Sequence, residues 1–244
     1  MSRKSYWDTD SYYEQPTAAE LKRNATDTMK KAKARGKVLH PIKVDGLRIS
    51  NSWWGSAWCE NLERYADYDN RLERGRRYLR TGSVIDLQIE KGKVFAKVQG
   101  RKKTPYKVEV RISPVNEERM QRIMDACGSQ IENLDLLLKG KFPKEMKEIF
   151  LEKGGLFPTP AEISFNCSCP DWALMCKHVA AVLYGIAVRF DEDPLLFFLL
   201  RGIDVDRFVQ VTLENSVESM LANIDVQSDR IIQTDGWEKL FGVL

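Results

Sequence analysis

Three cysteines and one histidine lie within a short stretch of this chain, in the spacing C-x-C-x6-C-x-H. They are Cys167, Cys169, Cys176 and His178. Three thiolates and one imidazole form a complete tetrahedral ligand set, and zinc uses such closed sites to stabilise small folded units. The spacing therefore predicts one structural zinc ion, whose ligands converge only when roughly residues 160–190 fold.

The spacing also predicts how the backbone runs between the ligands. Cysteines two positions apart in a regular strand point to opposite faces, so the chain must turn at Ser168. Residues two positions apart on a helix do not share a face. We therefore expect Cys176 to precede a helix and His178 to lie in its first turn.

Other interpretations of the cluster are weaker. A catalytic zinc keeps one coordination position open, and four protein ligands leave none. A redox pair is typically C-x-x-C beside a βαβ unit, and this spacing is absent. Five cysteines are an odd number, which disfavours a disulfide framework. Buried cysteines without a metal remain the alternative.

The residues around the ligands resemble a known family. Pro170-Asp171-Trp172 follows the second cysteine and His178-Val179-Ala180-Ala181 begins at the histidine, and this segment resembles the SWIM zinc finger. With Trp53-Trp54-Gly55 and Asn70-Arg71-Leu72, about residues 50–205 resemble bacterial SWIM zinc finger family proteins. The resemblance implies a β-β-α zinc module, binding of DNA or proteins, and a helicase-like ATPase of the chromatin-remodeller type as partner.

Hydropathy patterns predict an α+β fold. Alternating residues predict antiparallel strands at 84–89, 94–98 and 106–112, with one solvated face and a hairpin turn at 90–93. Helical periods or caps predict helices at 18–34, 53–62, 120–127, 131–138, 144–150, 177–189 and 194–201. The expected architecture is an antiparallel β-meander with helices, a small β-β-α zinc module and a helical C-terminal tail.

Four segments are expected along the chain. These are a basic, weakly ordered or helical N-terminal segment (1–50), an α+β domain with the meander (51–155), the zinc finger module (156–203) and an acidic, partly helical tail (204–244).

The charge distribution suggests an anionic partner. Residues 1–112 carry 25 basic and 14 acidic side chains, whereas residues 113–244 carry 13 and 21. A turn-like stretch from residue 70 and the hairpin loops concentrate the basic residues, with Tyr106 nearby. The alternative is an ordinary solvated edge. The candidates for phosphate contacts are Arg71, Arg74, Arg76, Arg77, Arg80, Lys91, Lys93, Arg101, Lys102 and Lys103.

The aromatic residues allow two interpretations. Trp53, Trp54 and Trp58 could stack on bases, but residues of this kind more often anchor a core. Trp172 is expected to pack over the metal site and shield its thiolates. Cys59 and Cys127 are expected to be small core residues.

No catalytic motif supports an enzyme. The chain has no phosphate-binding glycine loop, G-x-S-x-G or H-E-x-x-H. It also has no apolar run of about 18 residues and no apolar core of a secretory signal at its start, so we expect a cytoplasmic protein with no membrane contact. The expected function is a zinc-containing adaptor that binds nucleic acid, DNA rather than RNA. The alternative is a zinc-stabilised protein-interaction subunit, suggested by the acidic tail and the apolar residues 194–200.

Overall fold

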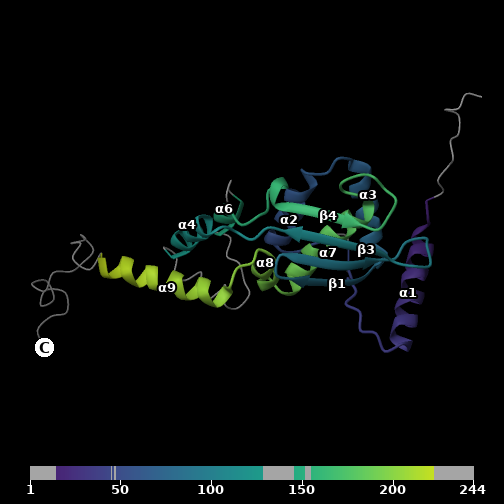
Figure 1. Ribbon diagram of the computed structural model, residues 1–244, viewed down its shortest axis with the longest axis horizontal. Helices are drawn as coiled ribbons and strands as arrows, with labels where there is room; N and C mark the ends of the chain where they lie inside the picture. Colours follow the sequence, from purple (N-terminus) through teal and green to yellow (C-terminus); the bar gives the residue numbers. More distant parts are fainter. Residues whose placement is uncertain (1–14, 45, 47, 129–145, 152–154, 223–244) are drawn as a thin grey trace, which may run out of the picture.

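An antiparallel sheet forms the centre of the computed structural model (Figure 1), which describes residues 15–44, 46, 48–128, 146–151 and 155–222. The strands pair in the order β1-β2-β3-β4. The first three confirm the predicted meander. The fourth comes from the zinc finger segment and adds to the same sheet. The strands are β1 (Val84–Glu90), β2 (Lys93–Val98), β3 (Tyr106–Ile112) and β4 (Ile163–Cys167).

The two faces of the sheet differ as predicted. On β2 the side chains of Val94, Ala96 and Val98 are buried, and the alternate residues are exposed. β3 continues the same alternation, with Val108 and Val110 on the buried face. One face therefore carries the core and the other faces solvent.

Helix α7 (Lys177–Glu192) covers the buried face of the sheet, and most of its residues are buried. It lies between the sheet and two further helices, α2 (Trp53–Glu63) and α3 (Asp69–Arg80). α3 approaches α7 closely at Gly75, where a Cβ atom would lie 2.6 Å from the Cβ of Ala180.

The prediction of a turn-like stretch over residues 70–80 is wrong, because these residues form α3. Leu72, Gly75, Tyr78 and Leu79 recur at helical spacing and are buried against the core. The arginines occupy the remaining faces of the helix. The many charged residues of α3 do not by themselves indicate a helix. Packing of its apolar face against α7 stabilises it.

The N-terminal segment is joined to the sheet. Helix α1 (Ala18–Ala34) begins at a capping box between Thr17 and Glu20, as predicted, and buries Leu21 and Ala25. Beyond it, the backbone N–H of Ile42 donates to the carbonyl of Val84. The chain after α1 therefore runs along the outer edge of β1.

Helices α4 (Glu117–Gly128) and α9 (Val205–Ala222) lie side by side and extend away from the sheet (Figure 1). A buried ion network lies near their base. The carboxylate of Glu162 pairs with Arg119 and Arg201, each at 2.9 Å, and Arg201 is fully buried. The other elements here are α6 (Met146–Leu151), the 3-10 turn Pro160–Glu162 and α8 (Leu195–Leu200).

Three tryptophans at the start of α2 pack into the core. Trp58 is fully buried and its Nε1–H donates to the carbonyl of Leu183 at 2.9 Å. Trp54 donates to the carbonyl of Phe190 at 3.0 Å, and Trp53 packs partly buried against the same core. The core interpretation, rather than base stacking, holds for these residues.

Strand β4 pairs with β3 over five residues, so one sheet runs through two of the predicted segments. Within residues 156–203, β4 is the one strand, and the expected β-β-α unit takes its first strand, β3, from the preceding segment. The four segment boundaries remain a prediction. The predicted helix at 131–138 lies outside the described residues, as do residues 223–244 of the predicted tail. Among the helices described, none has the length and apolar character needed to cross a membrane.

Candidate metal centre and adjoining basic cleft

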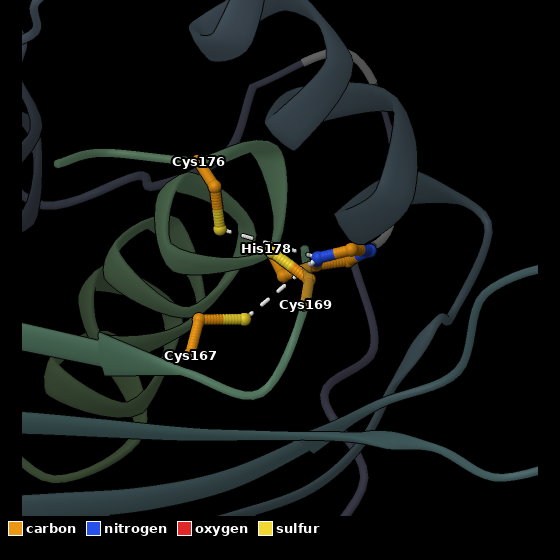
Figure 2. Close-up of side chains that lie close together, drawn as sticks. All are labelled: Cys167, Cys169, Cys176 and His178. Carbon is orange, nitrogen blue, oxygen red and sulfur yellow. Dashed lines mark hydrogen bonds between the residues drawn. The ribbon is translucent and has the colours of Figure 1, made fainter. Parts of the chain in front are cut away.

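The four predicted zinc ligands meet where β4 ends and α7 begins. Cys167 is the last residue of β4, and the chain turns at Ser168, whose N–H donates to the carbonyl of Lys107 at 3.0 Å. Cys176 is the N-cap of α7, so His178 lies in its first turn. Figure 2 shows the four side chains directed toward one another. Both backbone predictions are confirmed.

The distances fit a tetrahedral ion. The ligand atoms of all four residues lie within 4.8 Å of one another. The Nδ1 atom of His178 is 3.9 Å from Sγ of Cys167 and 4.0 Å from Sγ of Cys176. With Zn–S bonds of about 2.3 Å and Zn–N bonds of about 2.0 Å, tetrahedral geometry separates ligand atoms by about 3.5–3.8 Å. The cluster can therefore hold one zinc ion with small side-chain adjustments.

The electrostatics of the cluster also favour a cation. Contact with Cys176, followed by burial, raises the pKa of the Cys167 thiol, and burial raises the pKa of Cys169. Burial lowers the pKa of His178, which keeps the imidazole neutral and able to coordinate. Three crowded thiols cannot all ionise without a positive charge between them. The cysteines whose side chains are described form no disulfide, so the donor set fits zinc.

Two tyrosines enclose the imidazole of His178. The ring of Tyr106 stacks on it with 4.1 Å between centroids, and the ring of Tyr78 meets it edge-on at 5.3 Å. The histidine directs Nδ1 toward the cysteines, while its Nε2 is buried with no hydrogen-bond partner among the described residues. Packing, rather than a hydrogen bond to Nε2, orients this ligand.

Carboxylates hold the six-residue loop between Cys169 and Cys176. Asp67 accepts hydrogen bonds from the N–H groups of Leu174, at 2.9 Å, and Met175, at 3.2 Å. Asp171 forms an ion pair with Arg71 of α3 at 3.2 Å. Sequence reasoning did not find Asp67, because it lies about a hundred residues from the loop and belongs to no motif.

The prediction that Trp172 shields the thiolates is wrong. Its side chain is 80% exposed and meets the ring of Tyr68 edge-on, with 5.7 Å between centroids. Tyr106 and Tyr78 provide the apolar cover of the site instead.

A cleft of about 830 Å³ adjoins the metal centre, and Cys169 and His178 form part of its wall. Five of the predicted phosphate contacts meet in it. They come from α3 and from the loop after β2, and Lys177 of α7 adds a sixth cation. Asp171 is the one carboxylate in the described wall. The basic residues lining this cleft, called the basic cleft below, are Arg71, Arg74, Arg77, Arg101, Lys102 and Lys177.

The remaining candidates lie elsewhere. Arg76 turns to the far side of α3, where it pairs with Glu63 at 2.5 Å. Arg80 and Lys103 are exposed but do not line the cleft. Lys91 and Lys93 line a separate cavity of about 490 Å³ at the opposite end of β2. The structure thus brings five of the candidate phosphate contacts together in the basic cleft and places the other five elsewhere on the surface.

Comparison with known proteins agrees with this geometry. Residues 166–184, which contain all four ligands, match the SWIM zinc finger family. The uncharacterized protein Rv2102 of Mycobacterium tuberculosis is 38% identical over 165 residues, a stretch that covers 66% of this chain. The same stretch spans 59% of the length of that relative. No solved structure matches this chain. The segment 166–184 is a SWIM zinc finger with a Cys3His cluster compatible with one zinc ion.

Proposed function

We propose that this chain, which carries a SWIM zinc finger at residues 166–184, is a nucleic-acid-binding adaptor that prefers DNA. The observation that carries the proposal is the basic cleft beside the metal centre. Among the described residues, six cationic side chains and one carboxylate line it. Phosphate groups are the anions that such a surface suits.

The arrangement of the cations favours a binding site for an anionic ligand over an ordinary solvent-exposed basic surface. Arg74 and Arg77 project from α3, Arg101 and Lys102 from the loop after β2, and Lys177 from α7. Segments far apart in sequence thus bring like charges to one concavity. Like charges placed close together repel, and a bound polyanion relieves that repulsion.

The zinc ion has a structural role in this proposal. When bound, it holds the ends of the loop from Cys169 to Cys176, and Pro170, Asp171 and Trp172 of this loop form one wall of the cleft. Four protein ligands leave no coordination position for a substrate. We therefore propose that the chain has no catalytic activity of its own and acts beside a helicase-like ATPase, the partner that the family resemblance implies.

A pair of double variants tests the proposal. Arg74→Glu/Lys102→Glu reverses two charges in the cleft, and Lys91→Glu/Lys93→Glu makes the same charge change at the opposite end of β2. The proposal predicts that the cleft variant loses at least tenfold in affinity for a DNA oligonucleotide, while the control changes little. Equal losses in both would indicate net charge alone, and no loss in either would reject the cleft.

A second function, protein interaction, has one observation in its favour. Leu213, Val217 and Leu221 are exposed at intervals of four residues along the outer part of α9. Residues 194–200, which the sequence suggests as such a surface, lie mostly in the core, because Phe197, Phe198 and Leu200 are buried. If protein interaction is the main function, with no direct nucleic-acid contact, Leu213→Glu/Val217→Glu abolishes binding to the ATPase partner and the parent chain binds no DNA.

A further inference from the structure

An exposed aromatic pair, Trp172 and Tyr68, lies beside the basic cleft. Trp172 is 80% exposed and lines the cleft, and Tyr68, which is 41% exposed, supports it edge-on at 5.7 Å. The guanidinium of Arg71 lies 5.9 Å from the Tyr68 ring. An exposed indole forgoes the stabilisation that its burial in the core would provide, and beside a basic cleft it offers a flat face on which a ligand can stack.

The pair is held on a fixed frame. Trp172 follows Asp171, which pairs with Arg71 of α3, and precedes the two N–H groups that Asp67 binds. The loop that carries it begins and ends at cysteines of the metal centre. A stacking surface on such a frame loses little conformational entropy when a ligand binds.

The chemistry of the cleft matches single strands better than duplexes. Clefts that bind single strands combine cations that follow the backbone with aromatic side chains on which bases stack. The basic cleft has both, and its volume of about 830 Å³ is of the size that encloses a small ligand or a short strand segment. A duplex keeps its bases stacked inside, where Trp172 cannot reach their faces.

We infer that the basic cleft binds single-stranded nucleic acid, with one base stacked on the exposed indole of Trp172. The inference rests on the proposed function and specifies its ligand. In this arrangement the phosphates contact Arg74, Arg77, Lys102 and Lys177. One base is unstacked from its neighbours and lies on the indole ring of Trp172. An apolar protein partner is a poorer fit, because the cations of the cleft would lose their hydration without gaining anionic partners.

The test uses the zinc-loaded chain and two probes. One is a deoxythymidine oligomer of about 12 nucleotides, and the other is a hairpin duplex with the same number of phosphates. Trp172→Ala should weaken binding of the single strand about 5- to 150-fold, the equivalent of about 1–3 kcal/mol for one stacked base. Trp172→Phe should retain most of the affinity. Binding of the hairpin should be weaker in the parent protein and unaffected by either change.

Leu174→Ala is the matched control. Leu174 lies two residues away in the same loop and is 81% exposed, but it does not line the cleft. Its removal should leave the affinity for the single strand unchanged. Zinc content, measured for each variant, shows that the finger is intact.

The outcomes separate this inference from the proposed function. If the parent protein binds no nucleic acid at low salt, the proposed function fails and the inference with it. If binding is present but Trp172→Ala equals the parent, or if the hairpin binds as tightly as the single strand, the inference alone is overturned. If Leu174→Ala and Trp172→Ala lose binding equally, a general apolar contact replaces base stacking. A uridine oligomer run in parallel shows whether the cleft distinguishes DNA from RNA.

Discussion

The ring of Tyr106 stacks on the ring of the zinc ligand His178, with 4.1 Å between centroids and 27° between planes. Both residues also line the basic cleft. Gly100 makes room for this contact, since a Cβ there would lie 2.9 Å from the Tyr106 ring. The metal centre and the cleft therefore share a wall, so loss of the ion should alter the cleft.

Cys176→Ser should remove the ion. The substitution takes away one of three thiolates at the start of α7, and structural zinc is retained only when the full set of ligands is present. Zinc per chain should fall well below one, and amide hydrogen exchange should accelerate around residues 163–180. Cys59→Ser is the control, because Cys59 lies outside the cluster. Full zinc content in Cys176→Ser would contradict the ligand assignment.

The metal centre was predictable because its information is local. All four ligands and their spacing lie within one short segment. Ligands two positions apart point the same way neither in a regular strand nor in a helix, so the chain must turn at Ser168 and the helix must start at Cys176. The strands were predictable for a similar reason, since β2 and β3 alternate on a sheet with one buried face.

The cleft was not predictable, because it is a tertiary feature. The basic residues were identified, but which of them converge depends on how α3 crosses α7. Arg76 and Arg77 are neighbours in sequence, yet one pairs with Glu63 and the other reaches the cleft. The loop that carries Trp172 is likewise held by Asp67, a distant residue that no sequence pattern connects to it.

Gly75→Ala should destabilise the fold. Alanine favours a helix over glycine by about 1 kcal/mol, but here the new methyl group would lie 2.6 Å from the Cβ of Ala180 and 3.0 Å from the backbone nitrogen of Ala181. Helices α3 and α7 must then separate, which costs about 1–3 kcal/mol. Urea unfolding, monitored by tryptophan fluorescence, should show a lower midpoint. An increase in stability would contradict the close approach of the two helices.

Glu162 should make stability depend on pH. Burial alone would raise its pKa, but hydrogen bonds from the Thr159 N–H and from Arg201 outweigh burial and lower the pKa to about 2. A carboxyl with a lowered folded-state pKa contributes stability above its unfolded value, about 4.5, and this contribution is lost as the pH falls from 4.5 toward 2.

Glu162→Gln tests that relationship. It leaves the fully buried Arg201 without its counter-charge, which should cost about 3 kcal/mol near neutral pH. The stability difference between parent and variant should shrink between pH 4.5 and pH 2, as measured by urea unfolding at each pH. Glu60→Gln, at an exposed position of α2, should show no such difference. A parent-to-variant difference that is constant with pH would contradict the role assigned to Glu162.

The salt dependence of DNA binding by the zinc-loaded protein tests the central claim most directly. Each phosphate contact with a single strand contributes about −0.7 to the slope of log K against log salt concentration. The four cations assigned to phosphate contacts, Arg74, Arg77, Lys102 and Lys177, give an expected slope of about −3. Micromolar binding at low salt with a slope near this value is the predicted result. Absence of binding at low salt, or binding that does not change with salt, would contradict the account.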